Sequence, residues 1–449
     1  MTSSGWIKAA FLTLATIGVV IISLTYILDR FYWQDQELNV ILISIEALRP
    51  DHMSVYGYER DTTPNLQDFY ANKSVFTHAY SPSPCTTPAV LQFLSGRFEH
   101  VNSTPIAEML KKEGYSTAAV VSQHRFRTDK GPKKAYARGF EYFNVQGLEE
   151  TSTHDFPTRS ATVVTDIALD WIEAHDLDDP FFLWLHYFDP HDPHNPPDGF
   201  RDYVAPGKGQ DFTGDVRTRL IDGLGDKEFH WQKNGEILSA EEIEYYNGLY
   251  DGEIRYVDHE IGKLLEYLDR RGLTEDSIII VTSDHGERLG EFDTWDHCLS
   301  VHNMEVQVPF LVSVKGGKLP GVDVDSVIAS TLDIYPTTLS LLGIDYNASE
   351  LDGIELIKAD SDRTVFSIWV QEKTLIKYPW KLHYYTENKS HSLINLDSDR
   401  METEDKSMKE KHINRELLAS MEKFIDEGHN YEKMYEQIKK HLQSIGYIP

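Results

Sequence analysis

The fold of this chain is decided by the stretch Asn39-Val-Ile-Leu-Ile-Ser-Ile-Glu46, a short apolar run that ends in an acid. Such a run is typical of a strand buried on both faces of a parallel sheet. A second run, Ser277-Ile-Ile-Ile-Val-Thr282, is followed by Ser283-Asp284-His285-Gly286-Glu287. Because ligand sites gather at the carboxyl ends of parallel strands, we expect Glu46, Asp284 and His285 to lie together. Two carboxylates and one imidazole suit a divalent metal ion.

Between and around these strands, strand and helix patterns alternate along the chain. Such alternation predicts an α/β fold with a mostly parallel central sheet that is sandwiched by helices. After Asp352-Gly353 the pattern changes to short strands and then to a charged helical tail. The segment 192–235 is rich in Gly, Pro and Asp and is predicted to be a loop beside the substrate entrance. Helices are expected at 63–73, 88–95, 106–113, 162–174 and 240–271, and further strands at 117–121, 181–187, 365–370, 380–385 and 392–396.

Nine landmarks occur along the chain in the order and spacing of one known superfamily. On these landmarks the chain resembles the sulfatase and alkaline phosphatase superfamily from about residue 38 to 400. The resemblance implies a small C-terminal antiparallel sheet packed against a helix. The landmarks are Asn39-Val-Ile-Leu-Ile-Ser-Ile-Glu46, Thr63-Pro-Asn-Leu66, Val75-Phe-Thr-His-Ala-Tyr80, Phe93-Leu-Ser-Gly-Arg97, Gly114-Tyr-Ser-Thr117, Phe181-Phe-Leu-Trp-Leu-His-Tyr-Phe-Asp-Pro-His191, Thr282-Ser-Asp-His-Gly-Glu287, Val308-Pro-Phe-Leu-Val312 and Asp333-Ile-Tyr-Pro-Thr337.

A chain of 449 residues, 41% of them hydrophobic, can bury a large core and leaves room for a smaller appendage. Residues 9–28 form an uncharged apolar run that is long enough to cross a bilayer as a helix. No small-residue cleavage site follows it, so we interpret it as an uncleaved signal anchor, with a buried core helix as the alternative. We therefore expect a membrane anchor at 1–30, a catalytic domain at 38–360 and a C-terminal sheet and helical tail at 361–449. The catalytic domain of this single-pass protein is expected outside the cytoplasm.

The formal net charge of −29 excludes nucleic acid as a partner, because phosphate backbones require basic patches. Only two cysteines occur, Cys85 and Cys298, and both lie beside the expected site. Large domains do not depend on disulfides, so two buried free thiols are the favoured interpretation. A single bridge across the rim of the site is the alternative.

Thr86, in the run Ser83-Pro84-Cys85-Thr86-Thr87-Pro88, is the candidate nucleophile that the resemblance implies. Formylglycine sulfatases carry Cys-x-Pro-x-Arg at this point, and the alignment places Thr86 at the nucleophile and Val90 at the arginine. The signal for formylglycine maturation is therefore absent, and Thr86 should stay a threonine. A plain hydroxyl can attack phosphorus if a metal ion lowers its pKa. The alternative is that Thr86 only caps the following helix.

The resemblance also implies the number of metal ions. Glu46 matches the first acid of the family's Asp-Asp pair, and Ala47 stands where the second acid would be. This loss suggests one metal ion, as in the lipoteichoic-acid synthase and phosphoethanolamine transferase branches. Its ligands would be Glu46, Asp284, His285 and Thr86. The imidazole favours Mn²⁺, with Mg²⁺, Ca²⁺ and Zn²⁺ as alternatives.

Three further histidines match positions that contact the reacting group in the family. His191 and His297 would face the non-bridging oxygens and could protonate the leaving alkoxide. His124 matches a histidine that touches the modified nucleophile in sulfatases, although the family lysine near it is Ser122 here. The alternative for each is a structural or surface histidine.

Together these features predict a membrane-anchored, metal-dependent enzyme that cleaves or transfers phosphoester groups through a covalent intermediate on Thr86. Small-molecule, lipid-headgroup or envelope-glycan esters are the expected substrates. Two alternatives stay open. One is a sulfuric ester hydrolase, a sulfatase that works without formylglycine or with Cys85 as the modified residue. The other is a metal-binding protein without catalytic activity.

Overall fold

The computed structural model describes residues 38–100, 103–122, 126, 136–145, 158–175, 179–192, 194–201 and 239–427. Within these residues no helix has the length and apolar character needed to cross a bilayer. The predicted anchor at 9–28 lies outside the described residues, as does most of the predicted loop at 192–235. The chain beyond residue 427 lies outside them too.

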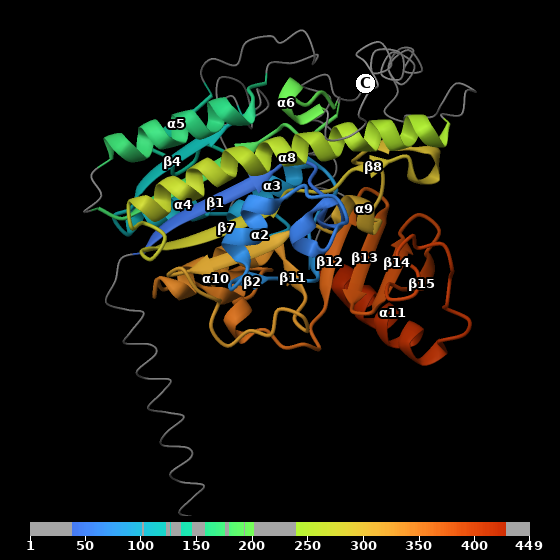
Figure 1. Ribbon diagram of the computed structural model, residues 1–449. Helices are drawn as coiled ribbons and strands as arrows, with labels where there is room; N and C mark the ends of the chain where they lie inside the picture. Colours follow the sequence, from blue (N-terminus) through green and yellow to red (C-terminus); the bar gives the residue numbers. More distant parts are fainter. Residues whose placement is uncertain are drawn as a thin grey trace, which may run out of the picture.

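A seven-stranded sheet forms the centre of the fold, in the order β2-β10-β7-β1-β6-β4-β5 (Figure 1). Strands β7, β1, β6, β4 and β5 are parallel, whereas β10 runs antiparallel to both β7 and β2. This confirms the predicted α/β fold with a mostly parallel sheet. The strands are β1 (Asn39–Ile45), β2 (Ser74–Val75), β4 (Ser116–Val121), β5 (Tyr142–Asn144), β6 (Phe181–Tyr187), β7 (Ser277–Ser283) and β10 (Phe310–Val314).

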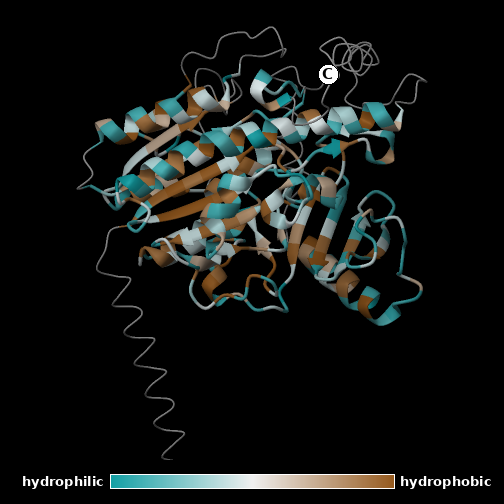
Figure 2. Cartoon of the chain, viewed as in Figure 1, coloured by the Kyte–Doolittle hydropathy of each residue, from teal (hydrophilic) through white to brown (hydrophobic). Residues whose placement is uncertain are grey.

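Helices cover both faces of this sheet, and the strands between them are strongly apolar (Figure 2). Because side chains alternate along a strand, Val40 and Leu42 pack in one core cluster and Ile41 and Ile43 in the other. The first face carries α3 (Thr86–Ser95), α4 (Ile106–Lys112) and α10 (Ile334–Leu341). The second carries α2 (Pro64–Tyr70), α5 (Ala161–Ala174) and α8 (Ala240–Arg270).

A four-stranded antiparallel sheet follows and packs against a helix, as the resemblance implies (Figure 1). Three of its strands lie within a few residues of the predicted bounds, and the second, which carries the buried Lys373, was not predicted. The elements are β12 (Val365–Trp369), β13 (Glu372–Lys377), β14 (Trp380–Tyr385), β15 (Ser390–Asn395) and α11 (Lys411–Asp426).

Short elements complete the described part of the chain. They are η1 (Pro50–His52), η2 (Ser54–Tyr56), β3 (Ala79–Tyr80), α6 (Asp198–Arg201), β8 (Arg288–Leu289), η5 (Glu291–Asp293), β9 (Trp295–Asp296), α9 (Asn303–Val306), β11 (Ala329–Ser330), η6 (Thr331–Asp333), η7 (Ala348–Glu350) and η8 (Leu356–Lys358).

Candidate active site

Three neighbouring parallel strands bring Glu46, His186 and Asp284 together. In the register of β1 with β6 and β7, Ser44 is opposite both His186 and Thr282. The period of two along each strand carries Glu46 and Asp284, just beyond the strand ends, to the same face as His186. Donor atoms of these three buried side chains lie within 4.8 Å of one another. Glu46 and Asp284 therefore meet at the edge of the sheet where the sequence analysis expects them.

Thr86 is the first residue of helix α3, which packs over that face of the sheet. Its Oγ1 lies 2.8 Å from Oε1 of Glu46 and 3.1 Å from Nε2 of His285. The Thr86 side chain does not cap α3, because the N-cap residue is Cys85, which makes no side-chain capping bond. A purely capping role for Thr86 therefore does not describe its contacts, and the hydroxyl points into the acid and imidazole cluster.

The orientation of His285 is set by its own backbone. Its Nδ1 lies 2.8 Å from the carbonyl oxygen of Gly286, a contact in which Nδ1–H donates and Nε2 keeps its lone pair for the site. Burial, followed by the neighbouring His297, lowers the pKa of His285 well below its ordinary value, so its ring is neutral. Gly286 is needed here, since a Cβ would lie 2.1 Å from the carbonyl oxygen of Met304.

The two carboxylates of the cluster, on Glu46 and Asp284, are fully buried. Burial and, next, the charge of Glu46 raise the pKa of Asp284 to about 7. Oδ1 of Asp284 accepts from the backbone N–H of Ala47 and of His285, at 3.2 and 2.9 Å. Oδ2 accepts no hydrogen bond from any described residue and lies 3.4 Å from Nε2 of His285. A divalent cation held by Glu46, Asp284, His285 and Thr86 would neutralise the negative charge of the two buried carboxylates. The donor set therefore fits one metal ion.

His186 is a site residue that the sequence analysis left without a role. Its Nε2 lies 3.2 Å from Oε2 of Glu46, and its Nδ1 lies 2.8 Å from Oγ of Ser44. Ser44 also accepts a hydrogen bond from Nε1 of Trp184 at 2.9 Å and donates to the carbonyl of Leu185 at 3.2 Å. Ser44 thus fixes the ring of His186 at Nδ1, while Nε2 contacts Oε2 of Glu46, the oxygen that Thr86 does not contact. The sequence signal for His186 was its place in the apolar run that forms β6, and its position opposite Ser44 came from the structure.

His191 and His297 lie beside this cluster. The ring centroids of His285 and His297 are 4.2 Å apart, and those of His191 and His297 are 4.9 Å apart. Nε2 of His191 lies 3.8 Å from Oε1 of Glu46. His124 falls outside the described residues, so its predicted contact with the nucleophile is not addressed by the structure.

Two carboxylates that the sequence analysis did not assign face the other side of His297. Nδ1 of His297 lies 3.0 Å from Oδ1 of Asp296 and 3.3 Å from Oε1 of Glu287. Burial raises the pKa of Glu287 to about 8. For Asp296 burial also opposes ionisation, but the charge and hydrogen bonds of His297 outweigh it and lower the pKa to about 2. The carboxylate of Asp296 therefore stays ionised beside the ring of His297.

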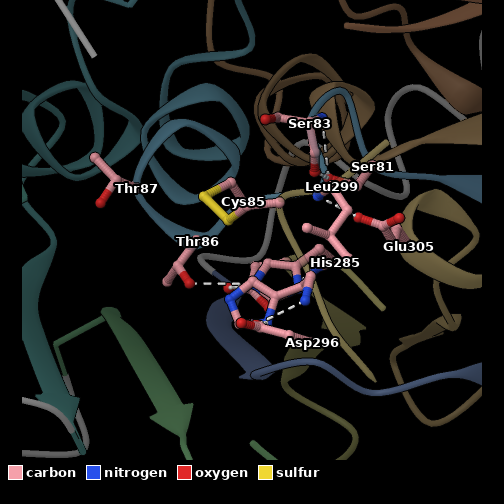
Figure 3. The surroundings of a disulfide bond; sticks show 12 residues. Ser81, Ser83, Cys85, Thr86, Thr87, His285, Asp296, Leu299 and Glu305 are labelled. Atoms are coloured by element: carbon pink, nitrogen blue, oxygen red, sulfur yellow. Dashed lines mark hydrogen bonds and ion pairs between the residues drawn. A yellow bond between two sulfur atoms is a disulfide. The ribbon is translucent and has the colours of Figure 1, made fainter. Parts of the chain in front are cut away.

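Cys85 and Cys298 form a disulfide bond, so the favoured expectation of two free thiols is wrong (Figure 3). The bridge joins residues 213 positions apart, next to Thr86 on one side and His297 on the other. Both residues are buried, and the chain fold brings their Cα atoms to 4.8 Å. Reasoning from domain size failed here because this bridge lies at the site, whereas such reasoning concerns bridges that stabilise a whole core. Figure 3 shows the bridge at the start of α3, with Thr86 directed toward His285.

With this geometry in view, comparison with known proteins gives the family. The sequence pattern of the Sulfatase family matches residues 38–344, which is more than half of the chain. The chain belongs to the Sulfatase family. The match places it in the sulfatase and alkaline phosphatase superfamily, as the nine landmarks predicted. Metal dependence is general in this family, in agreement with the buried group of Glu46, His186 and Asp284, whereas the identity of the metal ion stays a prediction.

Individual relatives extend this picture. An ulvan-active sulfatase from Formosa agariphila is 28% identical over 359 residues, which cover 71% of this chain and 63% of that protein. This chain therefore covers less than two thirds of the length of that relative. A protein solved in complex with its substrate, D-glucosamine-2-N,6-O-disulfate, has a TM-score of 0.66 at 17% identity, with 88% of this chain and 99% of that chain covered. A phosphonate monoester hydrolase of Agrobacterium radiobacter has a TM-score of 0.64 at 16% identity, with 87% and 95% covered.

These relatives change the order of the functional hypotheses. The relatives matched by sequence are named mostly as sulfatases, and the family match supports a hydrolase of the sulfatase family. The phosphonate monoester hydrolase, at 16% identity, shows a shared fold alone. The sulfuric ester reading, an alternative in the sequence analysis, is better supported than phosphoester cleavage or transfer.

Proposed function

We propose that this sulfatase-family member hydrolyses sulfuric esters of glycans or small molecules at the site around Thr86. The family match and the relatives named as sulfatases support sulfate chemistry. The observation that carries the proposal in the structure is the hydroxyl of Thr86, which lies within 3.1 Å of both the carboxylate that follows β1 and the imidazole that follows β7. A hydroxyl this close to the carboxylate of Glu46, which can accept its proton, and to a metal-binding cluster fits covalent ester cleavage.

A metal ion would be held by Glu46, Asp284, His285 and Thr86. When bound, such an ion supplies positive charge that lowers the pKa of a coordinated hydroxyl and draws electrons from the ester. Two atoms support this assignment: Oδ2 of Asp284, which accepts no hydrogen bond from any described residue, and Nε2 of His285, which keeps its lone pair toward the site. Mn²⁺ remains the metal ion that we favour.

In the first half-reaction Thr86 transfers its hydroxyl proton to Oε1 of Glu46, 2.8 Å away, and its oxygen forms a bond to sulfur. The bond from sulfur to the alcohol oxygen breaks, and His297 donates the proton at Nε2 to that oxygen. In the second half-reaction a water attacks sulfur and gives its proton to His297. The bond between sulfur and Thr86 breaks, hydrogen sulfate leaves, and the threonine oxygen regains its proton from Glu46.

Phosphoester or phosphonate ester cleavage is the second candidate function, because the candidate nucleophile is a threonine hydroxyl and not a formylglycine. Thr86 is an unmodified hydroxyl, and Cys85 cannot become formylglycine while its Sγ is bonded to Cys298. Release of sulfate by elimination, which formylglycine permits, is therefore closed to this chain. Attack of a hydroxyl on phosphorus needs no such modification.

The test is a substrate panel on the purified full-length chain with Mn²⁺ added. Aryl sulfate, aryl phosphodiester, aryl phosphomonoester and aryl phosphonate monoester would be compared for wild type, Thr86→Ala and Thr86→Ser. We expect aryl sulfate to have the highest kcat/KM, with activity lost in Thr86→Ala and partly kept in Thr86→Ser. A higher kcat/KM for a phosphorus ester would replace the sulfate proposal with the second candidate. Metal binding without turnover of any ester would support a non-catalytic role.

A further inference from the structure

The disulfide between Cys85 and Cys298 joins the two segments that carry the proposed nucleophile and the proposed proton donor. Cys85 directly precedes Thr86 at the start of α3, and Cys298 directly follows His297. The two segments also share a backbone hydrogen bond, in which the N–H of Cys298 donates to the carbonyl of Pro84 at 3.0 Å. The bridge therefore acts between two site residues rather than between distant parts of the surface (Figure 3).

The turn that carries His297 has a backbone that its own sequence does not favour. Asp296 has a φ of 90° and Cys298 a φ of 61°, so His297 lies between two non-glycine residues in left-handed conformations. Such conformations are unfavourable for residues with a Cβ and persist where surrounding structure imposes them. The preceding hairpin, β8 with β9, has two residues in each strand and forms a sheet of its own, separate from the seven-stranded sheet.

Contacts on both sides of His297 hold this turn. On the upstream side the N–H of His297 donates to Oδ1 of Asp296 at 2.7 Å, which is a contact within the turn. On the downstream side the N–H groups of Leu299 and Ser300 donate to Oε2 of Glu305 at 2.8 and 3.0 Å. The bridge and the bond to Pro84 add the connection to the segment of Thr86.

We propose that the Cys85–Cys298 disulfide is a positioning element, which fixes the ring of His297 relative to the hydroxyl of Thr86. This inference rests on the proposed function, in which His297 transfers protons during cleavage at Thr86. The reactive geometry of such a pair is sensitive to small shifts, and a displacement of 1 Å can cost about 100-fold in rate. Because the bridge acts on the proton donor, its loss should lower kcat much more than it raises KM.

The experiment compares oxidised and reduced full-length chain in two backgrounds, wild type and His297→Ala. Dithiothreitol supplies two electrons and two protons to the bridge and becomes a cyclic disulfide, and titration of two thiols per chain verifies complete reduction. In wild type we expect kcat to fall about tenfold or more while KM changes by less than about twofold. In His297→Ala, where the residue that the bridge positions is gone, reduction should have no further effect on kcat. The Cys85→Ala/Cys298→Ala variant should match reduced wild type and be insensitive to dithiothreitol.

Three results would overturn the inference. The first is an unchanged kcat in fully reduced wild type. The second is an equal loss of kcat on reduction of His297→Ala, which would show that the bridge acts through another group. The third is loss of Mn²⁺ binding or of cooperative unfolding in the reduced chain, which would mean that the bridge maintains the fold.

A measurement without substrate separates this inference from the proposed function. In chain labelled with ¹⁵N-histidine, the ring signals of His297 are assigned by their absence in His297→Ala. Reduction should shift these signals and leave those of the exposed His412 in place. A shift in a chain that turns over no ester would support the bridge as positioning element and reject the proposed function. Unshifted His297 signals would reject the positioning role.

Discussion

Oγ1 of Thr86 lies 2.8 Å from Oε1 of Glu46, although the two residues are 40 positions apart and come from a helix and a strand end. The contact arises because α3 begins at Thr86 on the face of the sheet to which Glu46 projects. It brings a hydroxyl to one carboxylate of a buried acidic pair, and this arrangement underlies the following predictions.

The metal-free chain should lose stability as the pH rises, because of Asp284. Burial and Glu46 raise the pKa of Asp284 to about 7, above its ordinary value of about 4. Between these values the folded state binds more protons than the unfolded state, so the free energy of unfolding falls as pH rises. The Asp284→Asn variant has no carboxyl group at this position, so this titration is absent. Thermal unfolding in the presence of a chelator should therefore give similar Tm values for both proteins at pH 4.5 and a higher Tm for Asp284→Asn at pH 8.

Added Mn²⁺ should reverse that order at pH 8, because only wild type keeps the full ligand set. Equal Tm values for the two metal-free proteins across this pH range would contradict the raised pKa of Asp284 beside Glu46.

His186 should support metal binding through Glu46 without contacting substrate. Its Nε2 holds Oε2 of Glu46 at 3.2 Å, and residues that orient a metal ligand typically contribute 10- to 100-fold in affinity. We expect His186→Ala to weaken Mn²⁺ binding by about tenfold or more, as measured by calorimetry. His412→Ala, at an exposed position of α11, is the control and should bind Mn²⁺ as wild type does. Equal affinities in the two variants would assign His186 to packing alone.

His297 should matter most for esters with poor leaving groups. General acid catalysis by a histidine typically contributes 100- to 10,000-fold, and it is needed most where the departing oxygen is strongly basic. We expect His297→Ala to lower kcat about 100-fold or more for an alkyl ester and much less for a nitrophenyl ester. Rates over a series of leaving groups would measure this. A loss that is the same for all leaving groups would point to charge stabilisation instead.

Glu402 should hold the C-terminal sheet to the catalytic part of the chain. Its Oε2 lies 3.0 Å from Nζ of the buried Lys381 on β14 and contacts His383, and its Oε1 accepts from the backbone N–H of Asn303 in α9. Glu402→Gln would remove the carboxylate that contacts the buried ammonium of Lys381. We therefore expect the free energy of unfolding, measured by urea denaturation, to fall by about 3 kcal/mol. Glu404→Gln, which alters an exposed pair with Lys409, should give no resolvable change. Similar stability of the two variants would contradict a structural role for Glu402.

The sequence was informative where a pattern is local. The apolar runs predicted β1, β6 and β7 almost to the residue, and their polar ends predicted that Glu46, Asp284 and His285 meet. It was less informative where the structure depends on distant residues. The strand β13 was missed because its Glu372 and Lys373 do not read as buried, although Lys373 is 4% exposed. The disulfide was judged from domain size, since no local pattern relates Cys85 to a residue 213 positions away.

His186, Glu287 and Asp296 escaped notice for the same reason. Each acts on another site residue rather than on the reacting group, and such a role depends on side-chain geometry. The membrane anchor at 9–28 and an extracytoplasmic location stay predictions.

The central claim is covalent ester cleavage by Thr86, and the most direct test is mass spectrometry of the rapidly quenched full-length chain during turnover of an aryl sulfate. The account predicts a peptide containing Thr86 with the added mass of one sulfo group, absent in Thr86→Ala. A phosphoryl group on the same threonine during turnover of a phosphorus ester would keep the nucleophile and change the substrate class. Turnover that persists in Thr86→Ala, with no modified threonine, would contradict the account.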